Sequence, residues 1–157
     1  MQEYYAAPME GLTGWRWRQV QSELFGGADR YYTPFLSPNA NFEFQTKELQ
    51  EIDPEHNRDL FVVPQILTNR PEYFVWAAKE CQSRGYSEVN LNLGCPSGTV
   101  TAKGKGSGLL ADVPALERLP DGGWLAAGKG HPASTSGRHI QCPSGPENFR
   151  QDTHRLG

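Results

Sequence analysis

The stretch that decides the fold is residues 87–96, S-E-V-N-L-N-L-G-C-P. Apolar and polar side chains alternate over residues 88–93, and this period of two predicts a strand with two unlike faces. Gly94 ends the run, so Cys95 lies where the strand opens into a loop. In parallel α/β proteins the loops at this end of the strands converge on the ligand-binding face. We therefore expect the thiol of Cys95 to face a pocket, where it can transfer a proton or attack carbon.

Three further apolar runs predict strands at residues 3–7, 31–33 and 61–67. The first is stopped by Pro8, because proline cannot continue a hydrogen-bonded ladder. The run at 61–67 is apolar nearly throughout, as expected of a parallel strand that is covered on both faces. Gln65 is its conspicuous polar member, and a buried glutamine needs a hydrogen-bonding partner.

Two helices are predicted between these strands. The first follows Thr13, which can cap it; it contains several aromatic and apolar side chains and ends at Gly26. The second is capped by Asn69 and ends at Gly85, with a buried stripe that repeats every three to four residues and consists of Phe74, Ala77, Ala78 and Cys81. Strands that alternate with helices predict a parallel α/β fold, either a barrel or an open sheet.

Composition limits the size and location of the protein. The 157 residues suffice for one ordinary domain but fall short of the ~250 residues usual for a closed (β/α)8 barrel. Glycine and proline are abundant, at 17 and 12 residues, and the mean hydropathy of −0.62 is low, so part of the chain is expected not to pack. Neither a signal peptide nor an apolar run of ~18 residues is visible, and we expect a cytoplasmic protein that does not enter a membrane.

Charge and cysteine usage exclude several classes of site. The net charge of −3 gives no general attraction to nucleic acid, so RNA binding would require a local basic cluster. Lys103, Lys105 and residues 15–18 are the candidates. The three cysteines lack C-x-x-C spacing and the four histidines form no ligand pattern, which argues against a disulfide framework and against a metal site.

The central stretch also resembles a known family. Asn92-Leu93-Gly94-Cys95-Pro96, followed by K-G-K-G-S-G-L-L at residues 103–110, is similar to the Asn-x-Gly-Cys-Pro hallmark and glycine-rich loop of the tRNA-dihydrouridine synthases. The opening A-P-M-E-G-L-T of residues 7–13 and the P-Q-I-L of residues 64–67 resemble two further segments of that family, in the same order. Residues 3–112 carry the resemblance.

The resemblance implies an incomplete (β/α)8 TIM barrel, with the first four strand-helix units in residues 1–118 and an irregular tail in residues 119–157. It also implies an FMN enzyme that uses NADPH to reduce uridine in tRNA to 5,6-dihydrouridine. Cys95 would then be the catalytic residue, donating a proton to C5 of the base. Asn92 would hydrogen-bond the uracil edge, and Lys103 and Lys105 would contact phosphate or order the loop.

On the cofactor side, the resemblance implies that Pro8, Met9 and Glu10 border FMN and that Gln65 hydrogen-bonds the isoalloxazine. Two simpler interpretations remain open at this point. The loop at residues 8–10 can be an ordinary strand-to-helix turn, and the partner of Gln65 can be a backbone group. No metal ligand is implied, and the sequence leaves the oligomeric state open.

Two other functions compete with this one. Dihydroorotate dehydrogenases also carry a cysteine-proline motif on a flavin barrel, where the cysteine acts as a base on a small acid. Alternatively, the chain is a non-catalytic fragment, because four strands cannot close an eight-stranded barrel. The open sheet edges would expose unpaired backbone groups that favour association with other chains. On this ground the chain as given is expected to bind FMN poorly and to catalyse little.

After about Leu119 the composition changes to scattered Gly, Pro and Ser without a periodic apolar face, and we predict no strand there. The family would next show a strand with Val-Lys-Thr-Arg. A synonymous coding of residues 147–157, read one nucleotide later, translates as R-I-S-V-K-T-R-I-G-L. We therefore hypothesise a frameshift between about Asp112 and Asn148; a naturally irregular tail is the alternative.

Overall fold

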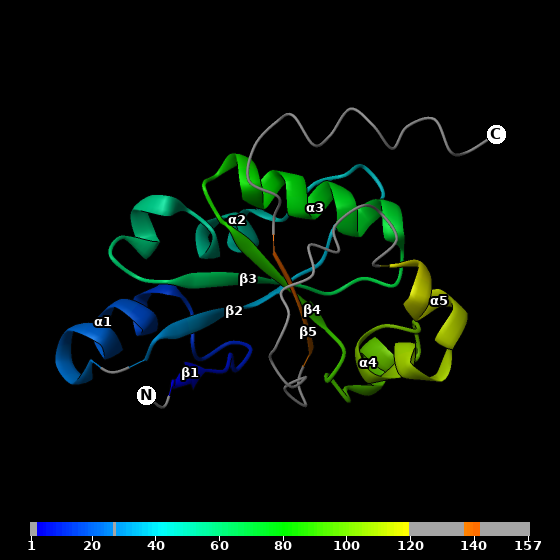
Figure 1. The fold of residues 1–157 in the computed structure, drawn as a ribbon, viewed down its shortest axis with the longest axis horizontal. Helices are drawn as coiled ribbons and strands as arrows, with labels where there is room; N and C mark the ends of the chain where they lie inside the picture. The colour runs from blue at the N-terminus through cyan, green and yellow to red at the C-terminus, as the bar shows by residue number, and fades with distance from the viewer. Residues whose placement is uncertain (1–2, 27, 120–136, 142–157) are drawn as a thin grey trace.

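The computed structural model describes residues 3–26, 28–119 and 137–141 and centres on a five-stranded sheet (Figure 1). The strands follow one another in the order β1-β2-β3-β4-β5, and the first four are parallel while β5 runs antiparallel to β4. Their bounds are Tyr5–Ala6 for β1, Arg30–Leu36 for β2, Val62–Ile66 for β3, Glu88–Asn92 for β4 and Gly137–Gln141 for β5.

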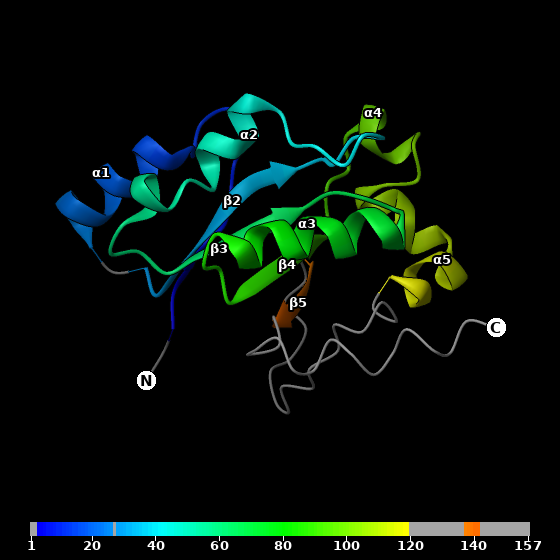
Figure 2. The same cartoon turned by 90° about the horizontal axis from the view of Figure 1, so that it is seen from above.

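Helices connect the parallel strands; those after β1 and β3 were predicted from the sequence, whereas the helical turns between β2 and β3 were not. Their bounds are Trp15–Phe25 for α1, Thr46–Glu51 for α2, Pro71–Ser83 for α3, Gly98–Thr101 for α4 and Val113–Arg118 for α5, with 3-10 helices at Pro54–Asn57 (η1) and Gly106–Ala111 (η2). Helix α3 runs along β3 and β4, and α4, η2 and α5 gather beyond the end of β4 (Figure 2). This α/β alternation with parallel strands is compatible with part of a TIM barrel.

Strand β4 has two unlike faces, and both are buried. On one face Val89 and Leu91 are fully buried and join the core under α3. On the other face the polar residues are also almost inaccessible: Glu88 pairs with Arg30, and Asn90 is 5% exposed. Buried polar side chains need hydrogen-bonding partners, so this face of β4 must border other polar groups inside the protein.

Strand β2 is longer than the predicted residues 31–33 and continues through Pro34 to Leu36. Its register with β3 shifts between Tyr32 and Phe35, which accommodates the proline that has no N–H to donate. At this bulge the hydroxyl of Thr33 accepts the backbone N–H of Gln65 at 3.0 Å. This backbone N–H is therefore satisfied, and the predicted end of the strand at residue 33 was wrong.

Neither predicted helix cap forms. Helix α1 begins after Gly14, while the hydroxyl of Thr13 accepts the backbone N–H of Met9 at 2.6 Å and closes the preceding loop. Helix α3 begins after Arg70, and the side chain of Asn69 instead donates to the carbonyl of Lys103 at 3.0 Å. Each side chain thus stabilises a loop at the carboxyl end of the sheet rather than a helix end.

The buried stripe of α3 is as predicted, since Phe74, Ala77, Ala78 and Cys81 are all fully buried. Strand β3 is buried at every position, also as predicted. In the described part of the chain, no helix combines the length and the apolar character that a bilayer crossing requires.

The end of the chain departs from the prediction in one respect. Residues 137–141 form a strand, although the sequence predicted none beyond Leu119; pairing with the edge of β4 needs only backbone groups, so an apolar period is unnecessary. Leu119, the first residue of the predicted tail, is 1% exposed and packs in the core. The remainder of the predicted irregular tail lies outside the described residues.

Candidate functional site

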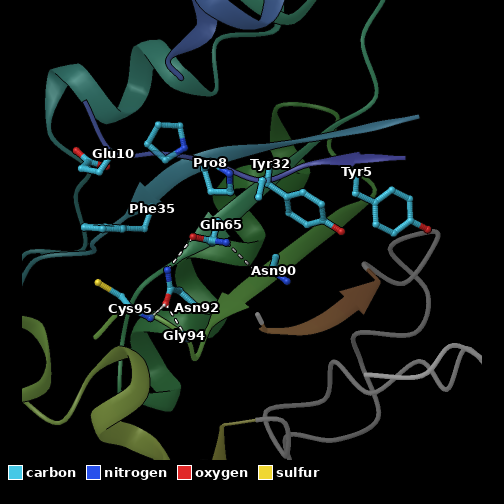
Figure 3. A pocket seen from close by; sticks show the side chains of 12 residues that line it. Tyr5, Pro8, Glu10, Tyr32, Phe35, Gln65, Asn90, Asn92, Gly94 and Cys95 are labelled. Carbon is cyan, nitrogen blue, oxygen red and sulfur yellow. Dashed lines mark hydrogen bonds between the residues drawn. The ribbon is translucent and has the colours of Figure 1, made fainter. Parts of the chain in front are cut away.

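An open cavity of about 510 Å³ lies at the carboxyl ends of the parallel strands (Figure 3). This is the place where parallel α/β proteins bind their ligands. The cavity brings together five of the residues that the sequence singled out, from the ends of three strands, β1, β3 and β4: Pro8, Glu10, Gln65, Asn92 and Cys95. Residues more than eighty positions apart therefore share one site.

Two buried amides form the polar centre of the cavity. Gln65, at 6% exposure, donates from Nε2 to Oδ1 of Asn90 at 3.0 Å, and its Oε1 accepts from Nδ2 of Asn92 at 2.8 Å. The partners of Gln65 are therefore side chains of β4, and the simpler interpretation of a backbone partner was wrong. Gln65 keeps a second N–H and a second lone pair, and Asn92 keeps a second N–H. The pair can thus bind a polar ligand without giving up its own hydrogen bonds.

Asn92 also fixes the start of the cysteine loop. Its Oδ1 accepts the backbone N–H of Gly94 at 3.1 Å and that of Cys95 at 3.0 Å. Because a backbone N–H can only donate, the orientation of the Asn92 amide is determined, and Nδ2 is the atom that donates to Gln65. One side chain consequently connects the cysteine loop to the polar centre of the cavity.

The glycine-rich loop holds Cys95 from its other side. Both the backbone N–H and the hydroxyl of Ser107 donate to the carbonyl of Cys95 at 3.1 Å. Gly106 has φ +56°, and a Cβ atom there would lie 2.6 Å from the same carbonyl oxygen, so no other residue fits without movement. The backbone of Cys95 is thus anchored at its N–H by Asn92 and at its carbonyl by Ser107.

Three of the predicted site residues do not line the cavity. Met9 is 58% exposed, and its backbone atoms bond within the turn that leads to Thr13. Lys103 and Lys105 lie on the glycine-rich loop outside the cavity. Partial burial lowers the pKa of Lys105 below its usual value, and the positive charge of the neighbouring Lys103 lowers it further. An anion beside these two ammonium groups would relieve that repulsion.

Aromatic side chains that the sequence analysis missed form another wall. Tyr5, Tyr32 and Phe35 line the cavity, and Figure 3 shows the two tyrosines at the end away from Cys95. The ring centroids of the tyrosines are 6.3 Å apart, and burial raises the pKa of Tyr32. Asn90 was also missed, although it shares the period-two face of Asn92. Flat apolar surface beside amide groups suits a planar heteroaromatic ligand.

The cavity contains no metal-binding arrangement: within the described ranges, no group of three His, Cys, Asp or Glu side chains is placed to hold an ion. The side chains that line the described cavity offer a thiol, amides, a carboxylate and aromatic rings.

Comparison with known proteins agrees with this geometry. A family model described as dihydrouridine synthase (Dus) matches residues 5–119. The chain is 29% identical over 114 residues to a probable tRNA-dihydrouridine synthase 1 from Synechocystis, covering 72% of this chain and 31% of that protein. It is 30% identical over 112 residues to a probable tRNA-dihydrouridine synthase from Staphylococcus aureus, covering 68% and 33%. A third relative, the tRNA-dihydrouridine(16) synthase of Ralstonia nicotianae, is 29% identical over 125 residues, covering 76% and 38%.

These alignments span about a third of the length of each relative. The family model, in contrast, covers well over half of this chain and includes every residue of the cavity described above. The resemblance that the sequence predicted is confirmed: the chain belongs to the dihydrouridine synthase family.

Proposed function

We propose that this protein takes part in the FMN-dependent reduction of uridine to 5,6-dihydrouridine in tRNA, with NADPH as the reductant. The observation that carries the proposal is that Cys95 shares one cavity with the buried amides of Gln65 and Asn92, in a chain of this family. The names of the relatives support tRNA as the substrate.

The residues of the cavity fit a flavin. A volume of about 510 Å³ lies within the ~300–1,000 Å³ common for small-molecule sites. Gln65 has an N–H and a lone pair to spare for the polar edge of an isoalloxazine, while Pro8 and Glu10 lie at the cavity wall. Met9 would act through its backbone, which shapes the turn beside the flavin, and not through its side chain. A bound flavin would supply hydride to the base.

Cys95 supplies the proton in this proposal. Hydrogen bonds hold the backbone N–H and the carbonyl of Cys95 in place. The side chain that carries the sulfur therefore starts from a fixed backbone position at the cavity wall. A thiol can be held protonated near neutral pH and still transfers its proton at moderate cost. A proton that moves from Sγ to C5 of uracil completes the addition of hydrogen across the 5,6 double bond.

Asn92 has two tasks. The geometry supports a positioning role, since its Oδ1 is committed to the backbone of Gly94 and Cys95. The second hydrogen of its Nδ2 remains for a carbonyl oxygen at the uracil edge. Because the amide cannot rotate without losing its backbone partners, we expect Asn92 to offer a donor and not an acceptor to the base.

Lys103 and Lys105 would contact the phosphates of the RNA. They lie on the loop that holds Cys95, and their mutual repulsion favours an anion at this place. The target base must be unstacked to reach the cavity, so contacts to the flanking backbone would hold it there.

We further infer that the four parallel strands and their helices are the first four units of a TIM barrel. The family match favours the tRNA enzymes over the dihydroorotate dehydrogenases, which the sequence had left open. The non-catalytic alternative makes a different prediction for the test below. The cytoplasmic location stays a prediction.

The experiment is to incubate the chain with FMN, NADPH and an unmodified tRNA transcript and to measure dihydrouridine by mass spectrometry. The wild-type chain should form product slowly, because its four strands leave the barrel open, and Cys95→Ala should lower the rate at least about a hundredfold, which is the lower range for a general acid. Cys81→Ala is the matched control, because its sulfur is buried in the core under α3. If Cys95→Ala kept full activity, the proton-donor role would be refuted; if the wild type formed no product, the non-catalytic alternative would stand.

A further inference from the structure

A second cavity of about 440 Å³ lies beside the first, between the amino-terminal end of α1 and the whole length of α2, which are neighbours in Figure 2. Pro34 lines both cavities. Lys47 of the second cavity lies with its Nζ 3.4 Å from Oε1 of Glu10, which lines the first. The two cavities are therefore adjacent, and a ligand longer than one nucleotide can contact both.

Trp15 and Arg16 line this second cavity and belong to a stack of side chains that His56 completes from behind. The ring of Trp15 lies parallel to that of His56, with centroids 3.8 Å apart and an interplanar angle of 8°. The guanidinium carbon of Arg16 lies 4.3 Å from the centre of the Trp15 ring. Nδ1 of His56 is 2.9 Å from the carbonyl oxygen of Gln50, so it carries the proton that this contact requires. The stack is already assembled, so binding a ligand against it costs little ordering.

Trp17 provides an open aromatic face. Its side chain lines the same cavity and the residue is 39% exposed. Among the described residues, its ring has no aromatic or cationic partner. An exposed tryptophan beside a cavity is a surface on which a base of any kind can stack.

The charges of the cavity favour an anion. The carboxylate of Glu51 is neutralised by buried Arg18, with 2.9 Å between Nη1 and Oε2. The pair of Lys47 and Glu10 is exposed on both sides and therefore weakly held. Arg16 makes no ion pair within the part of the chain that the structure describes. The lining thus keeps one uncompensated guanidinium next to two indole rings.

We propose that this second cavity is a subsite for a single-stranded nucleotide of the RNA that flanks the target uridine, with its base stacked on Trp17 and its phosphate paired with Arg16. The inference rests on the proposed function, because the target base would occupy the first cavity. Aromatic and basic groups together are the combination that binds unpaired nucleotides, whereas a peptide or lipid would not need both.

The test is the affinity of the full chain for a fluorescein-labelled unmodified tRNA transcript, measured by anisotropy over a series of salt concentrations. Trp17→Leu keeps apolar bulk but removes the π face, and it should weaken binding about tenfold. Arg16→Ala should weaken binding and reduce the slope of log K against log[salt] by about one. Phe25→Ala is the matched control, since Phe25 is 81% exposed on the same helix and does not line the cavity; its affinity should be unchanged.

Several results would overturn the subsite. Wild-type affinity in both Trp17→Leu and Arg16→Ala would do so, as would an equal loss in Phe25→Ala, which would indicate a general effect of the apolar surface of α1. A wild-type chain that binds no tRNA would also refute it. Failure of the proposed function is seen separately, as the absence of dihydrouridine or of flavin binding in a chain whose tRNA affinity does depend on Trp17.

Discussion

Helices α1 and α3 follow the strands of the first and third strand-helix units, yet they are attached to the sheet by opposite means. Helix α3 buries four apolar side chains completely and joins the main core. The only fully buried residue of α1 is Arg18, while Val20, Leu24 and Phe25 are 52%, 68% and 81% exposed. Similar helices in sequence order can therefore be held by apolar packing in one case and by a polar network in the other.

The network of Arg18 is extensive for a single side chain. Its guanidinium donates to the Glu51 carboxylate at 2.9 Å, to the Glu51 carbonyl at 2.8 Å and to Oδ1 of Asn57 at 2.9 Å. These contacts join α1 to α2 and η1, and α1 follows the loop that carries Pro8 and Glu10 to the cavity. We infer that the polar network sets the position of this loop, whereas the α3 core mainly supplies stability.

The largest effect is expected from Phe74→Ala in α3. Phe74 is fully buried, and removing its ring should lower the free energy of unfolding by about 4 kcal/mol through lost transfer energy and a cavity. Urea denaturation followed by circular dichroism measures the change. The matched control is Tyr73→Ala at the neighbouring, partly exposed position, which should cost less. Equal losses at both positions would contradict the apolar attachment of α3.

Arg18→Ala should cost about 3 kcal/mol, because it leaves the buried Glu51 carboxylate without its cation. The control is Arg16→Ala, two residues away and exposed, which should have little effect on unfolding. The double variant Arg18→Met/Glu51→Met should recover part of the loss, since both charges are then gone. Strictly additive single losses would show that the two side chains do not act as a pair.

A smaller, pH-dependent effect is expected at Tyr86, which borders the same network. Burial raises its pKa to about 12, against about 10 in the unfolded chain, and its hydroxyl accepts from Nδ2 of Asn57. The folded state thus favours the protonated phenol, so this contribution is complete below pH 10 and is lost as the pH rises from 10 through 12.

Unfolding free energies measured between pH 8 and 11 should therefore fall more steeply for the wild type than for Tyr86→Phe, by about 1 kcal/mol at pH 11. Parallel curves for the two proteins would contradict the burial of this hydroxyl.

Much of the site could be predicted because its signals are local. The alternation over residues 88–93 and the following Gly94 placed Cys95 at a strand end, and the apolar run around Gln65 predicted a buried amide. Asn90 occupies the same face as Asn92, so period two could have identified it as well. The strand ends then meet because parallel strands present their carboxyl ends at one edge.

Other features depend on contacts that no local pattern encodes. Ser107 reaches the Cys95 carbonyl only because the glycine-rich loop folds back on the strand end. Thr13 and Asn69 are residue types that often cap helices, but their side chains hydrogen-bond to backbone groups of loops instead. Arg18 looks like a solvated residue in a basic segment, and only the fold shows that Glu51 and Asn57 surround it.

The central claim is that the cavity at the strand ends is a flavin site in which Gln65 provides a polar contact and Cys95 acts on the substrate. Titration of the chain with FMN, followed by quenching of flavin fluorescence, tests it most directly. We predict weak but saturable binding, which Gln65→Leu weakens further by about tenfold and which Cys95→Ala leaves within about twofold. Absence of saturable binding by the wild type, or equal affinity in Gln65→Leu, would contradict the account.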